Sequence, residues 1–257
     1  MPSTTAWGKF CQFSFHWIRQ RLAYRLALAI VFCVPIAAHA QDMWSKAAAP
    51  YRPTLVKSIT MTGTATRFPG SNQRQGNVTL KMSSLGMGIL LFEDQYSPIE
   101  ETIPERASSK PCQKTDSAGN LVDEAWHNCF LPAPWFLPQL SLFSLDSSQW
   151  THTLGASGTD MIGIDIRNEF YDHPKQEAAV LSNLSSVSAY FDRPSLFLTM
   201  YCYTLHPLNN ANAGVPAVVL YSDYRMISGV PIPFRIKQYL ASTIAFDIQI
   251  ENAQVSN

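Results

Sequence analysis

An alternation of apolar and polar residues recurs along the chain and constrains its fold more than any other feature. From Thr243 to Glu251, every second residue is isoleucine or phenylalanine, and the residues between them are alanine or polar. Successive side chains of a β-strand point to opposite faces, so this spacing predicts a strand with one buried face. Clusters of turn residues at 69–72 and 228–229 separate such segments, as expected for antiparallel neighbours. Further strands are expected at residues 55–68, 78–82, 88–92, 161–166, 195–203, 217–227 and 234–237.

Helical patterns are few. Two short helices are expected, at residues 41–49 and 175–186. Hydrophobic residues make up 46% of the chain and aromatic residues 12%. The apolar and aromatic side chains on the expected strands suit a curved sheet with a large interior. Such an interior is either filled by its own side chains or open to a ligand, and the alternation is compatible with both.

The first 40 residues have the pattern of a secretory signal peptide. They contain four basic residues and no acidic one, then an apolar run at residues 26–38, and they end in Ala38-His39-Ala40. The run is shorter than the roughly 20 residues of a membrane-spanning helix, and Pro35 interrupts it, which argues against a membrane anchor. We therefore expect residues 1–40 to be removed near Ala40. Residues 41–257 are then expected to form a single soluble, periplasmic domain without a stable membrane span.

The cysteines outside the predicted signal are Cys112, Cys129 and Cys202. In an oxidising compartment, we expect Cys112 and Cys129 to form a disulfide. Closing a loop of that size stabilises a fold by about 3 kcal/mol on the chain-entropy description. Cys202 is expected to be a buried, inert thiol on a strand. The cysteines and histidines show no spacing typical of a metal site, so no metal is expected.

Residues 96–142 contain six prolines and predict an irregular loop inserted between strands. The end of this stretch is unusually apolar, since Trp135, Phe136 and Leu137 follow one another. A loop this apolar is not freely solvated. It either packs onto the core, which is the simpler alternative, or covers a ligand cavity as a lid.

No pattern typical of catalysis is present. The sequence contains no G-x-S-x-G nucleophile elbow and no phosphate-binding loop, and the four histidines outside the predicted signal are scattered. Basic and acidic residues balance at 19 each, which excludes a basic nucleic-acid binder. We expect no cofactor and no catalysis. A hydrolase with an unrecognised site, such as one using Asp165 and Glu169, is the enzyme alternative.

Three blocks of the chain share features with a known family. Residues 56–93 combine a first strand containing Gly63, a turn, and Gly-Asn-Val-Thr-Leu before an apolar strand. Residues 190–197 contain Tyr-Phe-Asp-Arg-Pro-Ser-Leu-Phe, and residues 229–236 read Gly-Val-Pro-Ile-Pro-Phe-Arg-Ile. In these blocks the chain resembles outer-membrane lipoprotein-carrier-like (LolA/LolB-like) periplasmic proteins. The resemblance implies a mainly β fold, a strongly curved antiparallel sheet that forms an unclosed half-barrel, with short helices and the Pro-rich loop on its concave side.

The resemblance also implies a function. In that family the cavity holds acyl chains, without cofactor or catalysis. The carrier's Arg-Pro element after the second strand is absent here, since residues 82–85 read Met-Ser-Ser-Leu. A periplasmic carrier or binding protein for a lipid, an acyl chain or a lipidated partner is therefore expected, rather than lipoprotein transfer itself. An envelope protein–protein interaction module with a filled interior is the alternative. The residues expected to line or cover the cavity are Met87, Leu91, Trp135, Phe136, Leu137, Phe197, Phe234, Phe246 and Ile248.

Overall fold

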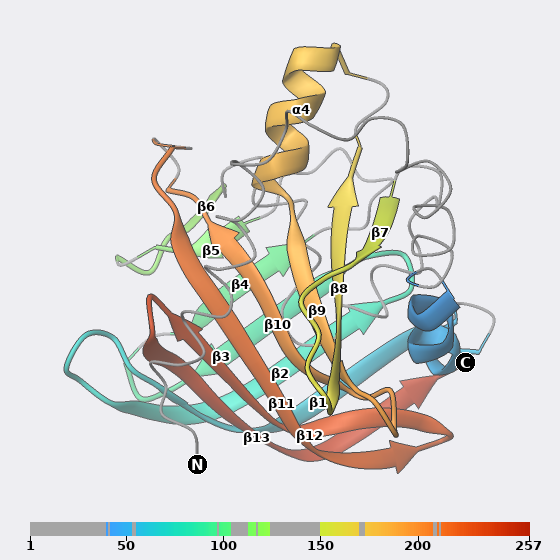
Figure 1. Ribbon diagram of the computed structural model, residues 1–257. Coiled ribbons are helices and arrows are strands. Elements are labelled where there is room, and N and C mark those ends of the chain that lie inside the picture. The colour runs from blue at the N-terminus through green and yellow to red at the C-terminus, as the bar shows by residue number, and fades with distance from the viewer. Residues whose placement is uncertain are drawn as a thin grey trace, which may run out of the picture.

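A computed structural model of the chain shows one antiparallel sheet of 13 strands (Figure 1). The structure describes residues 40, 42–52, 55–96, 98–103, 113–116, 118–123, 150–169, 173–207, 210 and 212–257. The strands are β1 (Ser58–Arg67), β2 (Arg74–Ser83), β3 (Gly88–Glu93), β4 (Ile99–Ile103), β5 (Gln113–Thr115), β6 (Leu121–Asp123), β7 (Trp150–Leu154), β8 (Met161–Asn168), β9 (Val187–Asp192), β10 (Leu198–Leu205), β11 (Val215–Ile227), β12 (Val230–Leu240) and β13 (Thr243–Ser256).

The order of the strands across the sheet follows the chain except at one place. The order is β6-β5-β4-β3-β2-β1-β13-β12-β11-β10-β9-β8-β7, and every neighbouring pair is antiparallel. The chain thus starts at the centre with β1, runs out to the edge strand β6, and comes back from the other edge, β7, to the centre. Among the described residues β6 and β7 do not pair, so the sheet is unclosed. The predicted mainly β, antiparallel half-barrel is confirmed.

The central pair, β1 and β13, contains a β-bulge beside Gly63. Thr62 lies opposite Asn252, but Gly63 lies opposite Ile250, so β13 has one extra residue there. A Cβ atom on Gly63 would lie 2.1 Å from the Gln249 carbonyl oxygen, and only glycine permits this approach. Bulges increase the local twist of a sheet and bend the bulged strand. This bulge therefore contributes curvature at the centre of the half-barrel.

The two faces of the sheet carry different side chains. One face, called here the inner face, holds a single large apolar cluster that includes Ile59, Leu80, Ile164, Ile236 and Ile248, all fully buried. Strands from both halves of the sheet contribute to this one cluster, which requires the sheet to curve around it. The opposite face is called the outer face.

A helical segment before β1 packs against the inner face. Residues 42–48 are α-helical, and the 3-10 helix η2 (Ala49–Tyr51) follows. The Trp44 ring stacks on His152 of β7 with centroids 5.2 Å apart and meets Phe191 of β9 edge-on at 5.9 Å. The Tyr51 hydroxyl donates a hydrogen bond to the Pro231 carbonyl oxygen of β12. The segment therefore fills part of the concavity of the half-barrel.

Both expected helices are present. The first corresponds to residues 42–48, and the second is α4 (Lys175–Leu184), which Figure 1 shows beyond the end of the sheet. α4 buries only Leu181 and Ser182, and its Val180 side chain is exposed. No helix within the described residues is long and apolar enough to cross a bilayer.

The described part of residues 96–142 holds strands that the sequence analysis did not predict. β4 pairs with β3, and β5 and β6 form a hairpin that extends the sheet to its edge. Asp116 closes the hairpin turn, because its Oδ1 accepts hydrogen bonds from the backbone N–H groups of Ala118 and Asn120. The expectation of an irregular stretch is wrong for these residues. The predicted domain boundaries stay predictions.

A second, smaller cluster lies on the outer face. It contains Tyr190, Met200, Cys202 and Val218. Cys202 is disulfide-bonded, so the prediction of an inert thiol is wrong. Cys112 and Cys129 lie outside the described residues, and their pairing stays a prediction.

Candidate functional site

The inner face is the candidate site, because it gathers apolar side chains from β1 to β3 and from β8 to β13. Three of the residues expected to line a cavity lie there. Phe234 and Ile248 are buried in the core cluster, and Phe246 is partly buried and packs against it. The rings of Phe246 and Phe92 meet edge-on, with centroids 5.8 Å apart. The structure therefore brings these three together on one face.

The other expected residues do not join this cluster. Leu91 lies between Leu90 and Phe92, which both point into the core, so Leu91 faces outward. Met87 lies in the turn before β3, where its N–H donates to Ser83 Oγ at 3.3 Å. The Phe197 ring packs on Tyr224 with centroids 4.7 Å apart and the ring planes tilted by 32°. Trp135, Phe136 and Leu137 lie outside the described residues. Ligand binding by any of the expected residues stays a prediction.

A group of tyrosines at the inner face was missed by the sequence analysis. Tyr51, Tyr201, Tyr203 and Tyr221 are buried, and Tyr224 is partly buried. Burial raises the pKa of the Tyr51, Tyr201 and Tyr221 hydroxyls, so all three are neutral. The order Tyr201-Cys202-Tyr203 predicts that the two tyrosine side chains lie on the same face of the strand. Tyr224 was not detectable, because Asp223 adopts a positive φ of 54° and shifts the alternation of β11.

The tyrosine hydroxyls differ in their hydrogen bonds. Tyr224 donates to the Leu198 carbonyl oxygen at 2.7 Å, and Tyr203 accepts from Gln238 Nε2 at 2.9 Å. The Tyr201 hydroxyl has no hydrogen-bond partner among the described residues. An unpaired buried hydroxyl costs free energy, and the described side chains of the inner face leave the Tyr201 hydroxyl unsatisfied.

His152 lies where the helical segment meets β7. Burial against Trp44 lowers the pKa of its imidazole to about 4, so the ring is neutral at pH 7. Its Nδ1 atom has no hydrogen-bond partner within the described residues. Those residues also contain no group of three or more His, Cys, Asp or Glu side chains that could hold a metal ion.

The chain therefore has the fold of an unclosed, curved antiparallel sheet with an apolar inner face. No protein-family description and no curated protein matches the sequence. Solved structures do match the fold. A putative outer membrane lipoprotein-sorting protein domain from Vibrio parahaemolyticus is similar with a TM-score of 0.55 and 8% identity, covering 86% of this chain and 93% of that one.

Two further solved structures are similar over the same extent. A DUF1329 family protein from Desulfovibrio piger has a TM-score of 0.52 and 8% identity, over 84% of this chain and 93% of that one. A LolA superfamily protein from Nitrosomonas europaea has a TM-score of 0.48 and 11% identity, over 85% of this chain and 94% of that one. The resemblance predicted from the sequence is confirmed at the level of the fold.

Proposed function

We propose that this protein is an exported, non-catalytic binding or carrier protein that holds a lipid, an acyl chain or a lipidated partner at its inner face. The observation that carries this proposal is the apolar surface that an unclosed sheet presents on one side. Each methylene group buried there contributes about 0.8 kcal/mol, so a long acyl chain binds without any charged contact. The likeness to a lipoprotein-sorting domain supports this class of ligand.

The helical segment offers a route by which a ligand enters. Trp44, Ala47, Ala48 and Tyr51 occupy the inner face, and all four are buried. A ligand takes the place of these side chains when the segment moves away from the sheet. The hydrogen bond from Tyr51 to Pro231 and the ring contacts of Trp44 hold the segment in the closed position.

The proposal is tested by native mass spectrometry of the protein after export of the full chain and purification without detergent. We expect a species heavier than the polypeptide, which releases a phospholipid or fatty acyl mass on activation. A Tyr51→Phe variant loses one contact of the segment and should exchange added lipid faster. A clean polypeptide mass that does not change with added phospholipid or lipopeptide contradicts the proposal.

A second candidate function is an envelope interaction module with a filled interior. The complete burial of inner-face residues such as Ile59, Met61 and Leu80 favours it, since each has 0% exposure. For this candidate, the same experiment gives only the polypeptide mass, and crosslinking in intact cells gives a protein partner. The two candidates therefore predict opposite outcomes.

A further inference from the structure

We propose a second binding site, on the outer face of the four central strands, that takes a neutral, hydroxyl-rich ligand such as a sugar ring. The site is a pocket of about 430 Å³ between β1, β2, β12 and β13, within the usual range for small-molecule sites. It is independent of the proposed function, because it lies on the other side of the sheet. The side chains that matter are Thr64, Thr66, Asn77, Arg235, Asp247 and Gln249.

The register of the strands sets these side chains in two rows across the sheet. One row runs from Asn77 through Thr64 and Gln249 to Arg235. The second runs from Gln75 through Thr66 and Asp247 to Lys237. The neighbours Ala65 and Ile248 point into the core, so both rows face outward.

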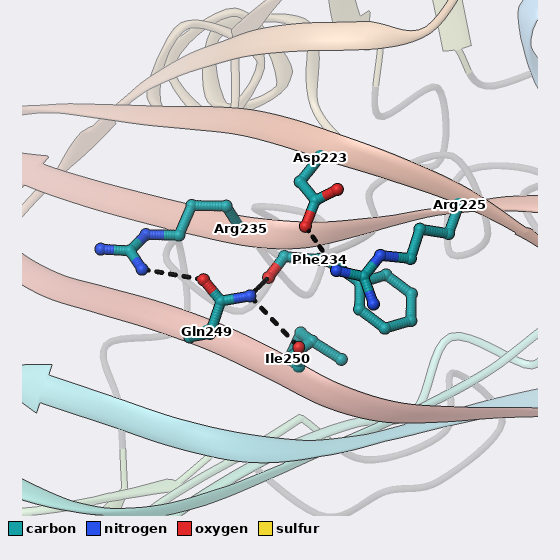
Figure 2. Close-up of polar contacts among 6 residues, drawn as sticks. All are labelled: Asp223, Arg225, Phe234, Arg235, Gln249 and Ile250. Atoms are coloured by element: carbon teal, nitrogen blue, oxygen red, sulfur yellow. Dashed lines mark hydrogen bonds and ion pairs between the residues drawn. The ribbon is translucent and has the colours of Figure 1, made fainter.

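Arg235 is held in place by a network that does not need a ligand. Its guanidinium donates to Gln249 Oε1 at 2.9 Å and to Asp247 Oδ2 at 2.5 Å. The Gln249 amide nitrogen donates in turn to the carbonyl oxygens of Phe234 at 3.1 Å and Ile250 at 3.3 Å (Figure 2). The amide of Gln249 is thus fixed in one orientation, and the floor of the pocket is preorganised.

Asp247 leaves one hydrogen bond unmade. Its Oδ1 atom is buried and has no hydrogen-bond partner among the described residues, although its side chain lines the pocket. A buried carboxylate oxygen without a donor costs free energy, so a ligand hydroxyl that reaches Oδ1 from the pocket would remove this cost. Lys237 Nζ lies 3.5 Å from Oδ2, and together with Arg235 it compensates the negative charge. The missing donor is therefore a neutral O–H rather than a third cation.

The remaining lining groups fit the same chemistry. Threonine hydroxyls and the Asn77 amide can each donate and accept, which matches a ligand whose every polar group is a hydroxyl. An anion that carries no O–H or N–H group cannot donate to Oδ1, and the lining offers an apolar ligand little surface. A sugar ring supplies a donor for Oδ1 and acceptors for the donors around it. The sugar can come from a free oligosaccharide or from the headgroup of a glycolipid.

The test is a titration of the isotope-labelled protein followed by NMR. The probes are glucose, N-acetylglucosamine and chitobiose as free sugars, and phosphatidylcholine bicelles with and without a glucosyl diacylglycerol. We expect shifts of the backbone amides of Thr64, Thr66, Asn77 and Gln249 with at least one probe. Binding of the free sugars indicates the first source, and binding only to the sugar-bearing bicelles indicates the second.

Variants distinguish ligand binding at this pocket from non-specific binding elsewhere on the protein. In Asp247→Asn the amide oxygen stays with Arg235 and the nitrogen replaces Oδ1, so a donor stands where the ligand needs an acceptor. We expect at least about tenfold weaker binding. Thr64→Val keeps the shape of the strand and should also weaken binding, whereas Thr79→Val, on the same face of β2 but outside the pocket, should not. Absence of pocket shifts with every probe at tens of millimolar, or equal binding by Asp247→Asn and Thr64→Val, overturns the proposal. Lipid binding in the mass spectrometry experiment is unaffected by either result.

Discussion

His152 of β7 joins the sheet to the helical segment, because its ring stacks on Trp44. It is packed on Trp44 as a neutral ring, and its pKa is about 4 instead of the ordinary 6.5. Between these two values the unfolded chain binds a proton that the folded chain does not bind. The free energy of unfolding therefore falls as the pH falls from about 6.5 to about 4.

This gives a prediction at the scale of one residue. Between pH 7 and pH 5, His152 should remove about 2 kcal/mol of stability. His152→Phe keeps the stacking on Trp44 but cannot take up a proton, so this part of the pH dependence should vanish. Urea unfolding at the two pH values measures it. His173→Gln, just before α4, is the control and should leave the pH dependence in place. An unchanged pH dependence in His152→Phe would show that the ring is not responsible.

Among the elements of the sheet, the β1–β13 pair depends on the absence of a side chain at Gly63. A Cβ atom on Gly63 would meet backbone of β13 at 2.1 Å, and backbone cannot rotate away as a side chain would. We expect Gly63→Ala to lower the free energy of unfolding by about 2 kcal/mol or more. Gly158→Ala is the matched control and should be neutral. Apart from its chain neighbours, no atom of the described residues lies within 4 Å of the position that its methyl group would occupy. Equal stability of the two variants would contradict the close approach.

Local pairing could be predicted from the sequence, but faces and distant pairing could not. The alternation at 243–251 and the turn at 228–229 were sufficient to predict the last strands of the sheet. In contrast, β3 reads Gly-Ile-Leu-Leu-Phe-Glu, an unbroken apolar run without alternation. Such a run does not indicate which face is buried, and Leu91 was expected on the face that Leu90 and Phe92 occupy.

Two further features depend on contacts that no sequence pattern reports. β1 pairs with β13 although residues 68–242 lie between them, and no local signal predicts such a pairing. The outer-face pocket combines side chains from four strands whose register comes partly from the Gly63 bulge. In sequence these residues are ordinary polar positions of alternating strands, so no pattern distinguishes them from other surface residues.

At the scale of the molecule, the C-terminal strand joins the two halves of the sheet. β13 pairs with β1 on one side and β12 on the other, and it adds Ile248 and Ile250 to the core. A chain that ends at Ser242 should therefore show no cooperative thermal transition by circular dichroism. Addition of a synthetic peptide of residues 243–257 should restore the transition at least in part. A cooperative transition of the truncated chain alone would show that the two halves fold independently.

The central place of β13 also bears on when the molecule can fold. Of the described strands, β13 at the middle of the sheet is the one made after all the others. A chain that lacks it has two open strand edges, on β1 and on β12, at the place where its sheet should be continuous. Long-range pairing of this kind is slow to form, because the loop between the partners must be closed first. For a chain that is threaded unfolded through a membrane, as its first 40 residues predict, this delay is an advantage. A chain exported in the unfolded state, as predicted from residues 1–40, could complete its half-barrel only after β13 had crossed the membrane.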